Sequence, residues 1–299
     1  MRPIFTIFSD IIPLSNRIKN QNWSCCFSKK RCLVFLLFIN SIGCFSQIAP
    51  VVPSPTSIAN TSVAELDEWN AFHNLPALAH IEKMEFAMQY ENRYMLNELN
   101  TKSVQAGFNA NFINVGIGFS HHGYSIYHEM LAGLGIARNF GDKFSMGVQF
   151  DYYTAYFHAA DESRYRGTVL AQFGIASTIF PKLTVGFHTF NPFQTSIKTE
   201  YTEKRIPSIF SIGANYAFAE NLKWLTQIDK EVSSNYRFAT GFEYRMIKEL
   251  TVKLGAYGSD YLVPALGLGL HLGGFHFNLN GELHPILGLN TIANLKYKF

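Results

Sequence analysis

The sequence predicts an all-β protein, a transmembrane antiparallel β-barrel of about 14 strands with a short N-terminal plug, or hatch. Three observations predict this fold: apolar and polar residues alternate with a period of two, the strands are long, and tight links alternate with longer ones. These features are typical of a closed sheet that has one face toward lipid.

The last ten residues show the alternation most clearly. One face of this strand is polar and carries Asn294, Lys296 and Lys298, and the other face carries Thr291, Ala293, Leu295, Tyr297 and Phe299. Because side chains alternate between the two faces of a strand, one face suits lipid and the other needs water, which in a closed barrel is the lumen.

The same pattern recurs along most of the chain. Residues 236–245 place apolar or aromatic side chains on one face, and residues 222–230 do the same with Leu225 as an exception. We therefore expect polar residues of neighbouring strands to face the lumen: Lys223, Asp229, Arg237, Glu243, Arg245, Lys253, His271 and His276. They should pair across the sheet or with the hatch in a structural role, and a polar permeation path is the alternative.

The strands are predicted near residues 83–92, 102–110, 113–121, 130–139, 144–155, 167–179, 183–190, 207–218, 222–230, 236–245, 250–257, 262–272, 275–283 and 290–299. The even-numbered links are tight, as at Gly141-Asp142 and Gly273-Gly274. The odd-numbered links are mostly longer, led by Arg93–Thr101, His122–Glu129, Tyr156–Arg166 and Asn191–Ile206. Bacterial barrels have short periplasmic turns and longer external loops, so both termini are expected in the periplasm.

A soluble β-sandwich would also show alternation, with its apolar face packed inward. Two features favour the membrane barrel. Aromatic residues form 15% of the chain and many lie at predicted strand ends, where an aromatic girdle would lie. The predicted strands are also roughly 9–12 residues long, against the ~5–6 usual in soluble sheets.

Residues 1–46 are predicted to be a leader that contains a signal peptide. Lys29, Lys30 and Arg31 precede an apolar run that ends at Ile39, and cleavage is expected after Ser46. The run is shorter than the roughly 20 residues of a membrane-spanning helix. A lipoprotein site at Cys44 is the alternative, although Ser41 occupies the position where such sites usually carry Leu.

The predicted leader contains all the cysteines and several of the basic residues of the chain. It holds all the cysteines, which are Cys25, Cys26, Cys32 and Cys44, so no disulfide or thiol chemistry is expected after cleavage. It also holds six of the 25 basic residues and one of the 22 acidic residues, which leaves 19 basic against 21 acidic. We therefore expect no binding of nucleic acid.

Residues 47–82 are predicted to form the hatch and residues 83–299 a single barrel. The stretch 47–62 is rich in Pro, Ser, Thr and Val and is expected to be extended, whereas 63–82 indicates a short helix and turn. This second stretch contains Asn74-Leu75-Pro76-Ala77-Leu78-Ala79.

An exported chain with this segment ahead of about 14 strands and a terminal Phe resembles the FadL-like barrels, particularly the PorV and PorQ branch linked to type IX secretion. Members are similar in having an Asn-Pro-Ala element in the hatch. The matching residues here are Asn74, Pro76 and Ala77, with Leu75 inserted. Leu295, Tyr297 and Phe299 resemble the signal that the barrel assembly machinery reads. The resemblance implies the outer membrane of a Gram-negative cell.

The resemblance implies two functions. We expect a secretion-system or surface-assembly component that binds a partner through the links Tyr156–Arg166 and Asn191–Ile206, because the modest loops leave little protein for a ligand gate. The alternatives are uptake of hydrophobic small molecules and a general porin. The expected partners are outer-membrane lipid, the assembly machinery, and secretion-system proteins or a hydrophobic ligand.

No enzyme, cofactor or metal site is expected. Gly133-Leu134-Gly135 and Gly267-Leu268-Gly269 lie inside strands without a following helix, so they predict lumen-facing glycines and not a nucleotide loop. A metal site would need His121, His122 and His128, or His271, His276 and His284, to converge with a carboxylate such as Glu129 or Glu282. A hydrolase would need Ser211, Ser233 or Ser234 beside a histidine.

Overall fold

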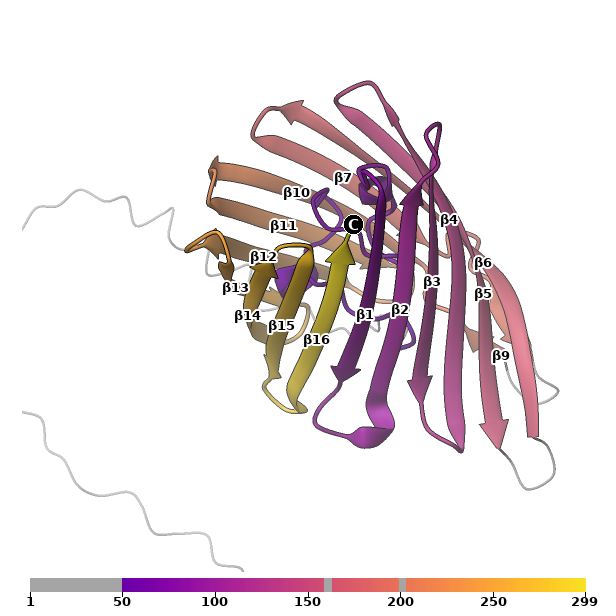
Figure 1. The fold of residues 1–299 in the computed structure, drawn as a ribbon. Coiled ribbons are helices and arrows are strands. Elements are labelled where there is room, and N and C mark those ends of the chain that lie inside the picture. The colour runs from indigo at the N-terminus through magenta and orange to yellow at the C-terminus, as the bar shows by residue number, and fades with distance from the viewer. Residues whose placement is uncertain (1–49, 159–162, 199–202) are drawn as a thin grey trace, which may run out of the picture. The chain divides into compact units, whose positions relative to one another are not determined.

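The alternating segments pair into a closed antiparallel barrel in a computed structural model, which describes residues 50–158, 163–198 and 203–299 (Figure 1). The leader lies outside the described residues. The barrel strands are β1 Met84–Asn92, β2 Asn100–Asn109, β3 Asn114–Gly123, β4 Tyr127–Phe140, β5 Phe144–His158, β6 Ser163–Phe180, β7 Leu183–Phe190, β10 Ile209–Ala219, β11 Leu222–Glu231, β12 Tyr236–Arg245, β13 Leu250–Gly258, β14 Leu262–Leu272, β15 Phe275–His284 and β16 Gly288–Lys298. This confirms the predicted fold class.

The barrel closes where its first strand meets its last. Strand β1 pairs with β2 on one side and with β16 on the other, and Phe86 lies opposite Tyr297 at this closure. Closure satisfies the backbone hydrogen bonds of strands that would otherwise have a free edge. Among the described residues, no helix is long and apolar enough to cross a membrane.

Burial follows the predicted alternation. On β12, Phe238 is 52% exposed and Phe242 is 45% exposed, whereas Arg237 and Ala239 on the opposite face are 5% and 4% exposed. Leu225, the exception on β11, is fully buried on the inner face. On β16, Lys296 is buried inside and Leu295 faces outward. The terminal Tyr297 and Phe299 rings contact each other on the outer face, with centroids 4.6 Å apart.

The strand ends differ from the prediction at one side of the barrel. The segments His122–Glu129 and Tyr156–Arg166, predicted as long links, are mostly strand, because β3 to β6 continue past the apolar band and remain paired. Polar residues occur on both faces there, so hydrophobic alternation does not reveal these extensions. The long Asn191–Ile206 link contains a hairpin of β8 Ser196–Lys198 and β9 Glu203–Arg205.

We use two names for the ends of the barrel. The turn end carries the links within 110–113, 141–143, 181–182, 220–221, 246–249 and 273–274, and also Phe299. The loop end carries the other links, and the longest of these joins β7 to β10.

The hatch contains two short helical turns, η1 Ile58–Asn60 and α2 Leu75–Leu78, and lies within the barrel. Glycines on the inner wall make room for it. A β-carbon at Gly186 would lie 2.2 Å from Val63 O, and one at Gly241 would lie 2.3 Å from Ile58 Cγ2. Gly267, by contrast, makes room for the cross-strand side chain of Asn280. The inner glycines therefore serve both the plug and the packing of neighbouring strands.

Candidate functional site in the plugged lumen

The hatch is bonded to the barrel wall at both ends of the lumen. At the turn end, the Asn114 amide on β3 donates to Ile81 O over 2.8 Å. At the loop end, Thr101 Oγ1 on β2 donates to Pro50 O over 3.1 Å. The hatch therefore extends through the whole depth of the lumen.

The Asn-Pro-Ala element of the hatch begins with Asn74, which is bonded within the hatch. The Asn74 side chain is fully buried, and its Oδ1 accepts from Asn70 N over 2.6 Å. Its Nδ2 donates to Glu65 O over 2.8 Å and to Glu68 O over 2.7 Å. Asn74 thus fixes the backbone of the acidic turn at residues 65–68.

Pro76 and Ala77 lie in α2 and pack against the wall. Pro76 occupies the first turn of the helix, where its missing N–H costs nothing, and its Cδ would lie 2.8 Å from a β-carbon at Gly174. Ala77 is 2% exposed. These contacts give the motif a role in packing the hatch.

Beside β4 to β7, the loop-end half of the lumen contains an apolar cluster next to buried polar side chains such as Glu129 and Gln172. Hatch residues and inward side chains of these strands form one hydrophobic cluster. Ile197 and Ile206 from the β7–β10 link enter it and are 3% and 4% exposed. The main wall and hatch members are Val51, Val52, Phe72, Leu131, Tyr153, Leu170 and Phe190. The described parts of the link therefore cover an apolar compartment, and we call residues 191–198 and 203–207 the lid.

Polar contacts fix the shape of the lid and attach it to the wall. Within the lid, Asn191 Nδ2 donates to Ile206 O over 2.9 Å, and its Oδ1 accepts from Thr195 N over 3.0 Å. Lys204 on β9 forms an ion pair with Glu129 on the inner face of β4. Sequence reasoning missed the lid, and the only signal was two isolated isoleucines in a polar link.

The wall formed by β10 to β16 is ionic. Asp229 accepts from Arg237 Nη2 over 2.5 Å and from Ser211 Oγ over 2.5 Å. Arg237 Nε and Nη1 are buried without a partner in the described structure. Arg237 lines a cavity of about 30 Å³ between hatch and wall, together with Phe72 and Phe190.

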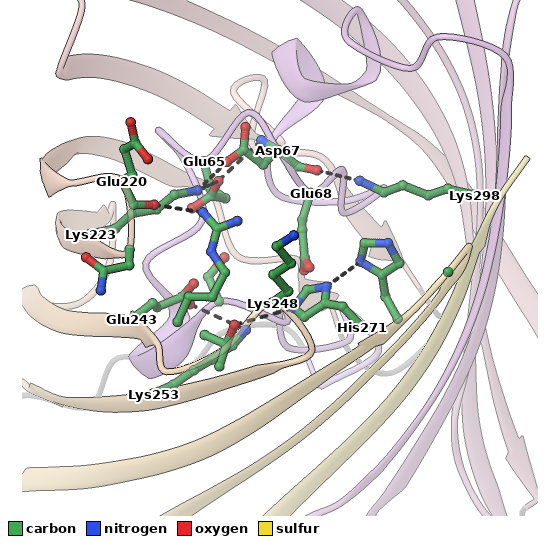
Figure 2. A pocket seen from close by; sticks show the side chains of 16 residues that line it. Glu65, Asp67, Glu68, Glu220, Lys223, Glu243, Lys248, Lys253, His271 and Lys298 are labelled. Carbon is green, nitrogen blue, oxygen red and sulfur yellow. Dashed lines mark hydrogen bonds and ion pairs between the residues drawn. The ribbon is translucent and has the colours of Figure 1, made fainter.

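The acidic turn of the hatch lies against lysines of this wall (Figure 2). Lys223 on β11 pairs with Glu65 and with Asp67, although the 72% exposure of the Asp67 side chain screens that pair. Lys298 Nζ on β16 donates to Asp67 O over 2.8 Å. The sequence predicted Lys223 on the lumen side, and the structure adds its hatch partners.

The buried Glu65 and the half-buried Glu68 of this turn have different pKa values. Burial raises the pKa of Glu65 to about 7, against the opposing effect of Lys223. Burial would also raise the pKa of Glu68, but the ammonium groups of Lys253 and Lys296 outweigh it and hold that pKa well below the usual range. Glu68 is therefore an anion in a positive field.

A second, larger cavity opens at the turn end beside this acidic turn. Its volume is about 390 Å³, and it is lined by the hatch, by β11 to β16 and by the turns between them. Lys253 donates to Thr56 O over 3.1 Å and pairs with Glu243 at 3.4 Å. Arg245 donates to Glu220 O over 2.7 Å at the rim.

Two predicted lumen histidines meet in this cavity. His271 on β14 and His276 on β15 lie opposite each other in register, and their Nδ1 atoms are 2.9 Å apart. The third histidine of that predicted group, His284, lies at the other end of β15, where its Nδ1 accepts from Leu287 N. The three therefore do not converge.

The other predicted histidine group is divided by strand parity. His122 faces inward, is 4% exposed and lies 2.9 Å from Thr101 Oγ1. His121 and His128 are on the outer face, where their rings stack with centroids 5.4 Å apart. Among the described residues, no group of three potential metal ligands is found.

Ser211 lies opposite His188 in register but donates its hydroxyl to Asp229. His188 Nε2 instead contacts Gln172 Oε1 at 3.0 Å. A nucleophile activated by a histidine requires a bond between the two, and this geometry directs both groups elsewhere. Ser233 and Ser234 lie in the β11–β12 link at the loop end, where Ser234 Oγ donates to Glu231.

No protein-family model and no curated protein matches the chain. Among solved structures, the toluene transporter TodX of Pseudomonas putida aligns with a TM-score of 0.60 at 9% identity, over 85% of this chain and 99% of that one. The fold is FadL-like. The CymD monoaromatic hydrocarbon channel aligns with a TM-score of 0.53 at 10% identity, over 75% and 90%. A FadL homologue of Pseudomonas aeruginosa aligns at 0.52 and 10% identity, over 84% and 96%.

Proposed function

We propose that the protein is a plugged outer-membrane channel for small hydrophobic molecules. The FadL-like fold supports this proposal, since neighbours with that fold are described as a toluene transporter and a monoaromatic hydrocarbon channel. The loop end then faces the exterior and the turn end the periplasm. The barrel assembly machinery would recognise the terminal Phe299.

The observation that carries the proposal is the apolar compartment beneath the lid. Its inner wall includes Leu131, Leu170 and Phe190, which are at most 3% exposed. A water-filled pore would have polar side chains at these positions. A compartment of this composition suits a molecule that leaves water readily.

The structure is a closed state of this channel. The cavity between hatch and wall holds about 30 Å³, whereas a cavity that binds benzene is on the order of 150 Å³. Passage of a hydrophobic molecule therefore requires the hatch and the lid to move. A covalent bond that fixes the hatch to the wall should block this passage.

A reversible disulfide tests this mechanism. A β-carbon at Gly241 would lie 3.6 Å from Ile58 Cβ, within the roughly 3.5–4.5 Å that a disulfide spans. Combining Ile58→Cys with Gly241→Cys also removes the Ile58 side chain that would clash. Residues 47–299 contain no cysteine to compete. Uptake of radiolabelled toluene should stop in oxidised cells that express the double variant and resume after reduction.

The Ile58→Cys single variant and the reduced double variant are the controls, and both should transport toluene. Equal uptake in the oxidised and reduced double variant, with the disulfide shown by gel migration, would contradict movement of the hatch. Heat-modifiable migration reports whether each variant is folded.

Two other functions make different predictions. A general porin would admit arabinose into liposomes at a rate that rises with the amount of protein, without raising toluene uptake. A secretion-system or surface-assembly component, as implied by the resemblance, would admit neither arabinose nor toluene. Such a role also needs an external loop that is free to bind a partner. The Asn191–Ile206 link instead directs Ile197 and Ile206 into the barrel.

A further inference from the structure

We propose that the turn-end cavity is a binding site for a small oxyanion with two or more negative charges, such as hydrogen phosphate. The cavity is distinct from the apolar compartment, and the proposal goes beyond channel function. Its volume of about 390 Å³ is open to solvent and large enough for a hydrated ion of this size.

Three of the five cations that line the cavity have no carboxylate partner in the described structure. Arg245, Lys248 and Lys298 all line the cavity. In the described structure, Arg245 and Lys298 bond only to backbone oxygens, and Lys248 has no partner. Arg245 ends β12 and Lys248 lies in the turn that follows it, whereas Lys298 lies at the end of β16. Lys248 and Lys298 therefore reach the cavity from separate parts of the wall (Figure 2).

Most of the five carboxylates that line the cavity already have a cationic partner. Glu243 is paired with Lys253, and Glu65 and Asp67 are paired with Lys223. Glu220 lies at the rim, where its backbone oxygen accepts from Arg245. Glu68 lies among the remaining lysines, and its lowered pKa shows that the local field favours an anion. The lysines around Glu68 therefore stabilise an anionic group at this point of the cavity.

The histidine pair adds hydrogen-bonding groups to the cavity. His271 and His276 share one hydrogen bond between their Nδ1 atoms, so at least one of these atoms has no proton and the pair does not carry two charges. Thr251 and the Nε2 atoms add hydrogen-bonding groups to the same wall. An oxyanion accepts several hydrogen bonds at once, and charged donors make such bonds strong.

A divalent oxyanion fits this arrangement better than a metal cation does. Lys248, Lys253 and Lys298 line the cavity and would repel a cation. If the turn end faces the periplasm, as the proposed function has it, the ion would come from that compartment. Binding itself does not depend on that orientation or on transport.

Calorimetric titration of the full-length protein in detergent at low ionic strength tests the site. Hydrogen phosphate should bind saturably with one ion per chain, and chloride should not replace it at equal concentration. Combining Arg245→Gln with Lys248→Gln should weaken binding roughly tenfold or more, because two charge-assisted contacts are lost.

The matched control combines Lys143→Gln with Lys182→Gln. Both lysines lie in exposed links at the turn end but outside the cavity, so the control removes the same net charge and should leave binding unchanged. Equal loss in both double variants would show nonspecific attraction and overturn the proposal. Absence of saturable binding in the folded wild-type protein would also overturn it. Imidazole NMR signals of His271 and His276 should shift with phosphate in the wild type and the control.

Discussion

At the scale of single residues, the hatch depends on Asn74. Its amide bonds to the backbone of Glu65, Glu68 and Asn70, so it presents both acidic side chains to the wall. The alternation of the sequence predicted the facing lysines but not these bonds, because the hatch has no periodic pattern.

The opposite pKa shifts of Glu65 and Glu68 predict opposite pH effects on hatch docking. The Glu68 pKa is lowered in the folded state, so its contribution is present above its ordinary pKa and is lost as the pH falls below that value. The Glu65 pKa is raised to about 7, so its contribution is present below its ordinary pKa and is lost as the pH rises through about 7.

Glu68→Gln should therefore raise the open probability at pH 7 by roughly tenfold, because a charge-assisted contact is lost. Glu65→Gln should instead keep the hatch closed at pH 8. Planar-bilayer recordings between pH 5 and pH 9 measure the open probability of both variants. Matching pH profiles for the two variants would contradict the assignment of opposite shifts.

At the scale of elements, the lid is held by two small apolar anchors. Ile197→Asp should release it, because burying an uncompensated carboxylate costs several kcal/mol. Cleavage by trypsin after Lys204 or Arg205 should accelerate by at least about tenfold. Ile247→Asp is the control, since Ile247 is 59% exposed in a turn at the other end. If trypsin cleaved the Ile197→Asp variant and the wild type at the same rate, the lid would not depend on this anchor.

The elements also show what the sequence could predict. Strands such as β12 and β14 were predicted with their bounds, because alternation is a local property of the chain. The extensions of β3 to β6 were missed because both of their faces carry polar residues beyond the lipid. The lid was missed because its anchors, Ile197 and Ile206, acquire meaning only from the tertiary packing around them.

At the scale of the whole molecule, wall and hatch are separable in principle. Backbone hydrogen bonds of the wall run between strands, and β1 to β16 close the ring without hatch residues. Deleting residues 50–82 should therefore leave an assembled barrel with a much larger single-channel conductance. Planar-bilayer recording compares the two proteins. Equal conductance in both would contradict the plugging role of the hatch.

The bonds of Pro50 to Thr101 and of Val51 to Ser120 have a consequence for biogenesis. The earliest described residues lie at the loop end, while the hatch joins β1 at the turn end. The ring is sealed when β16 pairs with β1, so the hatch must be enclosed by that step or threaded through a finished ring. A bulky folded domain fused ahead of Pro50 would resist threading, and the barrel could then form only by closing around a hatch already in place.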